Sequence, residues 1–187
     1  MKKALIIGMV VVLLLIMIVP FGTAMAKWTP PTHVAEETPE YYLAAHAVVV
    51  KDGMEETAWA DCNNSQQFPG KNWAWYFSYP GNEGEGMPMG YEYDNAWGLY
   101  AGKNTLMGWV IVEITDGVME ITFLAQGGWM LAETHLAVVT AAEGWQAIPQ
   151  TKSGNPKVGQ FVGLDGEKSG IQFDPPVETF TYIYNIP

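Results

Sequence analysis

Hydrophobic and polar residues alternate with a period of two along most of the chain after residue 40, which is typical of β-strands with one buried face. The alternation is sharpest over residues 72–79, where one side of the predicted strand carries only aromatic residues: Trp73, Trp75, Phe77 and Tyr79. Further strands are predicted at 41–50, 129–140 and 178–186. No stretch after residue 26 shows sustained helical periodicity with caps.

A β-hairpin is the clearest local prediction. Residues 106–115 and 118–125 are two strand-type runs separated only by Asp116-Gly117. This dipeptide favours a type I′ turn, which needs positive φ at both positions. We therefore expect the two runs to pair as neighbouring antiparallel strands.

The number and length of these runs predict an all-β fold. Six to nine short antiparallel strands in about 150 residues are typical of a sandwich or a barrel, and we favour an antiparallel β-sandwich. The segments between strands, chiefly 80–90 and 141–159, are rich in Gly, Pro and Asn and predict long loops.

Residues 1–26 have the pattern of a cleavable signal peptide. Two lysines precede an uncharged apolar run from Ala4 to Val19, and Ala24-Met25-Ala26 provides the small residues that signal peptidase requires. The alternative is a membrane anchor, but the apolar run is shorter than the roughly 20 residues that span a bilayer. We therefore expect a secreted, extracellular protein with a Pro-rich extended leader at 27–40 and one β-domain at 41–187.

The charge balance narrows the classes of partner. After removal of residues 1–26 the chain has 7 Lys, no Arg and 20 Asp and Glu, so its net charge is 7 − 20 = −13. Nucleic acids and anionic membrane surfaces are bound mainly through Lys and Arg, so neither is an expected partner. The single cysteine, Cys62, either is buried or cross-links two chains.

Five segments carry a resemblance to a known but uncharacterised domain. They are residues 45–49 (AHAVV), 56–59 (ETAW), 68–77 (FPGKNWAWYF), 128–136 (GWMLAETHL) and 154–161 (GNPKVGQF). Together they resemble a β-rich domain of secreted and cell-surface proteins of archaea and bacteria, which implies a location and a fold class but no chemistry. The segments stand in a different order here, as if circularly permuted. On that hypothesis the 41–50 strand lies antiparallel beside the 178–186 strand.

One group of residues could support acid–base chemistry or metal binding. Glu133 and His135 are two apart on a predicted strand and therefore share a face. With His46 from another strand they could converge into a ligand site. The alternative is a structural hydrogen-bonded group, and because no nucleophile or second carboxylate accompanies them, we predict no catalytic residues and no enzyme.

Two oxygen-rich loops are candidates for calcium, the one cofactor that the sequence suggests. Asp61 and Asn63 lie in the first, and Glu92 and Asp94 in the second. Calcium takes six to eight oxygen ligands, but neither loop has the spacing of a dedicated site. Solvated turns are the alternative, because Asn and Asp favour turns without a metal.

Tryptophans suggest a possible ligand surface. Trp28 and Trp145 fall in predicted loops, and Trp97 follows the Gly-rich loop, so these three could stack on sugar rings. The aromatics of 73–79 are expected to fill the core instead. The sequence thus predicts a non-catalytic extracellular interaction or surface-structural module, able to self-assemble or to bind an extracellular protein or glycan. The alternative is a carbohydrate-binding module that uses exposed Trp residues.

Overall fold

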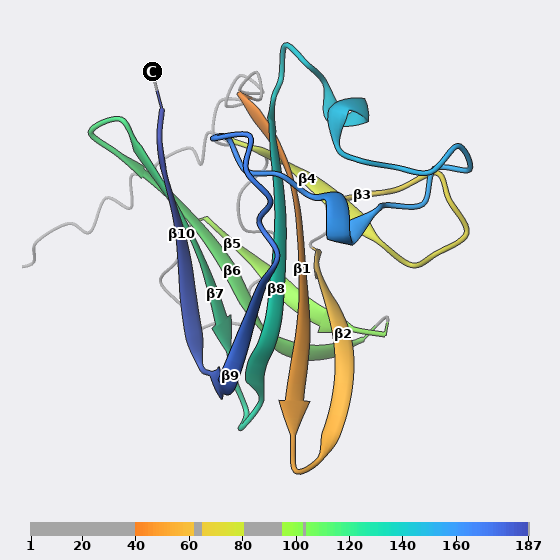
Figure 1. The fold of residues 1–187 in the computed structure, drawn as a ribbon, viewed down its shortest axis with the longest axis vertical. Coiled ribbons are helices and arrows are strands. Elements are labelled where there is room, and N and C mark those ends of the chain that lie inside the picture. The colour runs from red at the N-terminus through yellow and green to blue at the C-terminus, as the bar shows by residue number, and fades with distance from the viewer. Residues whose placement is uncertain (1–39, 62–64, 81–94, 103, 187) are drawn as a thin grey trace, which may run out of the picture. The chain divides into compact units, whose positions relative to one another are not determined.

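The computed structural model describes residues 40–61, 65–80, 95–102 and 104–186, all within the compact unit Val34–Pro187. The prediction of an all-β antiparallel fold is confirmed (Figure 1). The strands are β1 (Tyr41–Lys51), β2 (Met54–Asp61), β3 (Gln66–Gln67), β4 (Trp75–Tyr79), β5 (Ala96–Ala101), β6 (Thr105–Thr115), β7 (Val118–Ala125), β8 (Met130–Thr140), β9 (Ile171–Val177) and β10 (Thr179–Asn185). Two single-turn 3-10 helices, η1 (Trp145–Ala147) and η2 (Val158–Gln160), lie between β8 and β9.

The strands form an open β-sandwich. Along one path the order is β10-β7-β6-β5-β2-β1-β4-β3, and β8 joins the other edge of β1 and carries β9. The short pairing of β2 with β5, from Ala58 to Asp61, connects the half formed by β9, β8, β1 and β2 to the half formed by β5, β6, β7 and β10. No ladder joins β9 to β10 in the part of the chain that the structure describes, so the sheet is not closed into a barrel.

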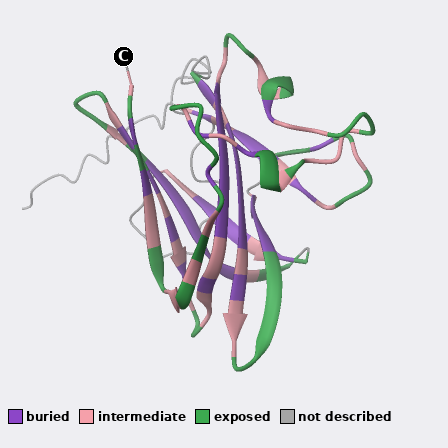
Figure 2. Ribbon diagram, in the orientation of Figure 1, coloured by how far each residue is buried: buried purple, intermediate pink, exposed green. Residues whose placement is uncertain are grey.

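One hydrophobic cluster lies between the two halves. It takes alternate residues of β1 (Leu43, Ala45, Ala47 and Val49) and of β7 (Met119, Ile121, Phe123 and Ala125). These residues are buried, whereas the ends of several strands are exposed (Figure 2). The hydrophobic positions of the period-2 sequence pattern are therefore the residues that face this inner cluster.

The Asp116-Gly117 hairpin is confirmed. β6 and β7 pair from Gly108↔Ala125 to Thr115↔Val118, and only Asp116 and Gly117 lie between the strands. Their φ angles are 52° and 77°, as a type I′ turn requires. The local turn signal was sufficient to fix this register.

The predicted neighbour relation between the first and last strands is wrong. β1 has β8 on one edge and β2 with β4 on the other, whereas β10 pairs with β7. Four strands (β2, β5, β6 and β7) therefore separate β1 from β10 within the sheet. Both edges of β1 are already occupied, by β8 on one side and by β2 and β4 on the other. The hydrophobic pattern alone does not determine strand order.

A second hydrophobic cluster covers the outer face of β1, β4 and β8. Its buried members include Trp59, Phe68, Tyr76 and Phe161, and the irregular segment 141–170 supplies part of it. β4 is therefore packed on both faces, since Phe77 and Tyr79 belong to the inner cluster. The expectation that residues 73–79 fill the core is confirmed for Tyr76, Phe77 and Tyr79, whereas Trp73 and Trp75 are only partly buried.

Some predictions fall outside the described residues. The signal peptide at 1–26, the leader at 27–39, Cys62 and most of the 80–90 loop are among them. The described chain begins at Glu40, whose backbone N–H donates to Tyr79 O (2.9 Å) and whose carbonyl accepts from Ala141 N (2.8 Å).

Candidate functional site

His46 and His135 lie directly opposite each other on β1 and β8. Their neighbours Ala45, Ala47 and Leu136 point into the inner cluster, so both imidazoles lie on the outer face of the sheet. The two ring centroids are 5.7 Å apart, and the ring of His46 is 4.9 Å from that of Trp59 in an edge-on arrangement. Strand pairing thus brings together two histidines that are 89 positions apart in the sequence.

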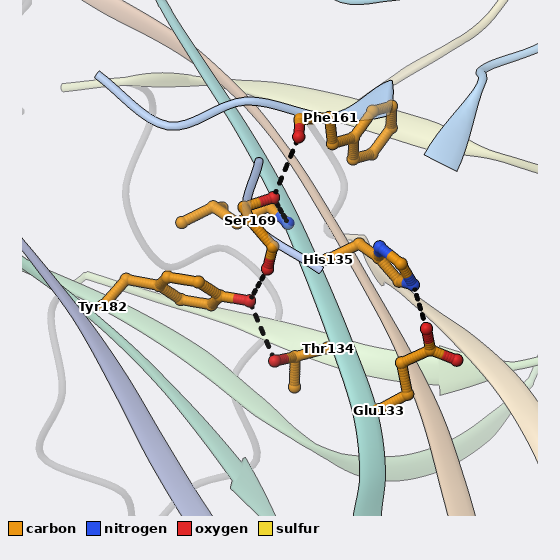
Figure 3. Close-up of polar contacts among 7 residues, drawn as sticks. Glu133, Thr134, His135, Phe161, Ser169 and Tyr182 are labelled. Atoms are coloured by element: carbon orange, nitrogen blue, oxygen red, sulfur yellow. Dashed lines mark hydrogen bonds and ion pairs between the residues drawn. The ribbon is translucent and has the colours of Figure 1, made fainter. Parts of the chain in front are cut away.

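Glu133 completes this group from the same strand as His135. Its Oε1 lies 2.8 Å from Nε2 of His135 (Figure 3). A proton on Nε2 donates this bond to the carboxylate, which fixes the ring orientation. Strand positions predicted the shared face of Glu133 and His135, and the pairing of β1 with β8 adds His46 to the group.

Burial decides what these histidines can do. Each is only 8% exposed, and the Nδ1 atoms of both are buried without a hydrogen-bond partner. Desolvation, helped by the nearby His135, lowers the pKa of His46 from 6.5 to about 3, so the ring is neutral at ordinary pH. Nε2 of His135 is already engaged by Glu133, and no cluster of three metal-ligating side chains occurs in the described residues. The geometry therefore favours a structural group over an open acid–base or metal site.

A second polar group lies on the inner side of β8. The Tyr182 hydroxyl of β10 is 2.9 Å from Thr134 Oγ1 and donates to the backbone carbonyl of Ser169 (Figure 3). All three residues are buried. Burial raises the pKa of Tyr182 to about 12. The hydrogen bond with Thr134 lowers this pKa in part, and the charge of Glu133 raises it further. This group links the two halves of the sandwich across the gap between β9 and β10.

The Ser169 hydroxyl is also engaged. Its Oγ accepts the backbone N–H of Leu136 (2.9 Å) and donates to the carbonyl of Phe161 (3.4 Å). The hydroxyl thereby ties the segment before β9 to the edge of β8. The polar group formed by Tyr182 and Ser169 was not identified from the sequence. The one sequence signal for it was the position of Tyr182 on the core side of a predicted strand, since a buried hydroxyl needs a hydrogen-bond partner.

The three tryptophans named as ligand candidates differ in their surroundings. Trp97 is only 5% exposed and stacks on Phe77 with centroids 4.3 Å apart, so the expectation of a surface platform there is wrong. It points inward from β5 as part of the inner cluster. Trp145 is partly exposed and stacks on Tyr76 at 4.8 Å with an interplanar angle of 16°. Trp28 lies outside the described residues.

The calcium candidates are mostly outside the described part of the chain. Asn63, Glu92 and Asp94 are not described, and Asp61 is the last residue of β2, where it is partly buried. Calcium binding at these loops therefore stays a prediction.

Comparisons with known proteins give no match to this chain. A scan against protein-family models, a search of curated proteins and a search of solved structures each found none. The resemblance to a β-rich domain of secreted proteins therefore stays a prediction. Among the residues that the structure describes, no helix is long and apolar enough to cross a membrane.

Proposed function

We propose that this protein is a non-catalytic interaction or surface-structural module that works outside the cytoplasm. The export pattern of residues 1–26 supports the location. The surplus of acidic over basic residues supports a partner other than nucleic acid or an anionic membrane.

The observation that carries the non-catalytic part of the proposal is the burial of the Glu133–His135–His46 group. A general base needs a free atom within hydrogen-bond reach of its substrate. Here Nε2 of His135 is bonded to Glu133, the Nδ1 atoms of both rings are buried, and burial lowers the pKa of His46 to about 3, which makes it a weak base. These residues are better suited to stabilising the outer face than to turning over a substrate.

Export is tested by expressing the full chain in a secretion-competent host and determining the N-terminus and location of the product. We expect protein outside the cytoplasm that begins at Lys27. The matched control, Ala26→Arg, alters the cleavage site alone and should yield uncleaved chain, because signal peptidase requires a small residue there. Uncleaved wild-type protein retained inside the cell would contradict the proposal.

Binding of a glycan is the second candidate, and Trp145 is the residue that favours it. Its indole is partly exposed and held in place by Tyr76, and Trp73 and Trp75 lie on the same cluster. A rigid, partly exposed indole suits stacking on a sugar ring. We expect Trp145→Ala to lose binding on a glycan panel and Trp145→Phe to keep part of it, with both variants still folded. Equal binding by all three proteins would remove this candidate.

A further inference from the structure

β10 forms one edge of the sheet, and the hairpin turn determines which of its backbone groups face outward. In a two-residue hairpin the flanking pair, here Thr115 and Val118, exchanges hydrogen bonds, and such pairs alternate along the ladder. Residues 119, 121 and 123 of β7 therefore direct their N–H and C=O groups toward β10. Their partners are Tyr184, Tyr182 and Phe180. It follows that the backbone groups of Thr179, Thr181, Ile183 and Asn185 face away from β7.

Two hydrogen bonds that bracket this ladder agree with the assignment. Ala125 N donates to Glu178 O (2.8 Å) at one end, and Ile186 N donates to Gly117 O (2.8 Å) at the other. No backbone partner of the outward groups of β10 occurs among the described residues. The edge of this seven-residue strand thus presents available donors and acceptors at four residues: Thr179, Thr181, Ile183 and Asn185.

The other free edges carry features that oppose pairing with a second chain. β9 contains Pro175 and Pro176, and Pro lacks the donor that a ladder needs. The first half of β2, unpaired by β5, is exposed and carries Glu55 and Glu56 (Figure 2). β3 is two residues long. Each of these features is a known protection against edge-to-edge association.

β10 has none of these protections. Its sequence, TFTYIYN, contains no charge and no proline and is composed mainly of β-branched and aromatic residues. Ile183 is 62% exposed, and only one other large hydrophobic residue in the described chain, Met54, is comparably exposed. An uncharged strand of this kind at a free edge is a site for pairing with another chain.

β9 does not cover this edge. The two strands are joined through Glu178, and they diverge from that turn toward opposite halves of the sandwich (Figure 1). Phe173 and Phe180 are in contact, with centroids 5.1 Å apart, but this contact packs against the inner cluster. The bridge from Tyr182 to Ser169 is likewise buried. Thr179, Ile183 and Asn185 are exposed and Thr181 is partly buried, so the outer side of β10 is accessible along most of its length.

We propose that β10 is a homotypic interface, at which the β10 strands of two copies pair antiparallel about a two-fold axis. The inference rests on the proposed function, since it gives the interaction module a surface and a partner. The outward groups all lie at odd positions, so a two-fold axis at Tyr182 pairs Thr181 with Ile183 of the second copy, and the reverse.

β10 is complementary to itself, which favours a second copy as the partner. Two acidic chains repel one another, and an uncharged strand lets them pair without bringing like charges face to face. β10 is uncharged over its whole length. In the pairing, the exposed Ile183 side chain packs beside a β-branched residue of the second copy, which is a favourable cross-strand pair.

The test is the solution mass of residues 27–187 by light scattering over a wide concentration range. We expect the wild-type mass to rise about twofold with concentration, as a closed two-fold dimer requires. Ile183→Lys should stay at the mass of one chain, because it places two like charges in the interface. The substitution should not destabilise the folded monomer, since the new lysine lies opposite Glu120 of β7 and forms a cross-strand pair of opposite charge.

Two further proteins keep the test decisive. Ile183→Pro removes a backbone donor that points away from β7, so it should also abolish the rise in mass. It replaces the Lys variant in the test if that variant misfolds. Met54→Lys places the same charge at the other exposed hydrophobic residue and should dimerise like the wild type. A wild-type monomer at all concentrations, or dimers of both Ile183 variants, would overturn the interface. An exported but monomeric protein would contradict this inference and leave the proposed function standing.

Discussion

His46 and His135 are held in a part of the sheet that ordinarily excludes charge. They face one another on β1 and β8, with Trp59 on one side and Glu133 beside His135. Gly170 closes over the second ring, because a Cβ there would lie only 2.9 Å from His135 Nδ1. Sequence reasoning could place Glu133 and His135 on one face. The contact with His46 depended on the register of β1 and β8, which is a long-range property.

The lowered pKa of His46 predicts loss of stability in acid. The unfolded chain binds a proton near pH 6.5 and the folded chain only near pH 3, so the unfolded state is favoured increasingly as pH falls through this window. Between pH 7 and pH 5 the cost from this residue is about 2 kcal/mol, at ~1.4 kcal/mol per pH unit. Denaturant unfolding at both pH values should show this loss in the wild type.

The matched variant is His46→Phe, which keeps an aromatic ring beside Trp59 and removes the titration. It should lose less stability than the wild type between the same pH values, and comparing the two proteins cancels the titration of the carboxylates. Identical pH dependence of the two proteins would show that His46 does not carry the effect.

The Tyr182 hydroxyl predicts a second effect at this scale. Tyr182→Phe leaves Thr134 Oγ1 and the Ser169 carbonyl short of a partner in a buried site. An unsatisfied buried polar group costs about 1 to 3 kcal/mol, so the free energy of unfolding should fall by that amount. Tyr184→Phe is the control, because the structure shows no hydrogen bond of that hydroxyl among the described residues. An equal loss in both variants would contradict a specific role for the Tyr182 bridge.

At the scale of elements, the structure separates what local sequence determines from what it does not. The β6–β7 hairpin was predictable to the residue, because a two-residue turn sets its register. The neighbours of β1 were not, because the same alternating pattern fits beside any strand with one buried face. β4 was also incompletely predicted, since its second buried face depends on Trp145 and Phe68 from distant segments.

The hairpin turn gives a prediction for this scale. Gly117 has a φ of 77°, and a Cβ there meets only Ile186 O at 3.4 Å, an ordinary contact. Gly117→Ala should therefore cost about 1 to 2 kcal/mol, from backbone conformation alone. Gly159→Ala is the control, since that glycine has open space and no positive φ, and its effect should be within about 0.5 kcal/mol. Equal effects on the midpoint of chemical unfolding would contradict the turn assignment.

At the scale of the whole β-domain, two features lay beyond the sequence pattern. Residues 141–159 were predicted to form a loop. In the structure the segment 141–170 also contributes Ile148 and Phe161 to the second hydrophobic cluster. The open gap between β9 and β10 follows from the pairing of β9 with β8 and of β10 with β7. Neither arrangement has a local signature, because both depend on residues far apart in the chain.

These features bear on the proposed role of the protein in association. His46, His135 and Tyr182 help to hold the sandwich together, and among the described strands β10 has the least protected edge. On the proposed function, association of residues 27–187 through β10 should depend on neither calcium nor reductant, because β10 contains no carboxylate and no cysteine.

The most direct test is sedimentation velocity of residues 27–187 at low and high concentration, with and without calcium and reductant. The account predicts a reversible shift from one chain to two as concentration rises, unchanged by either additive. A single species with the mass of one chain in every condition would contradict it. Assembly seen only with calcium, or lost with reductant, would also contradict it and would point to the oxygen-rich loops or to Cys62 instead of β10.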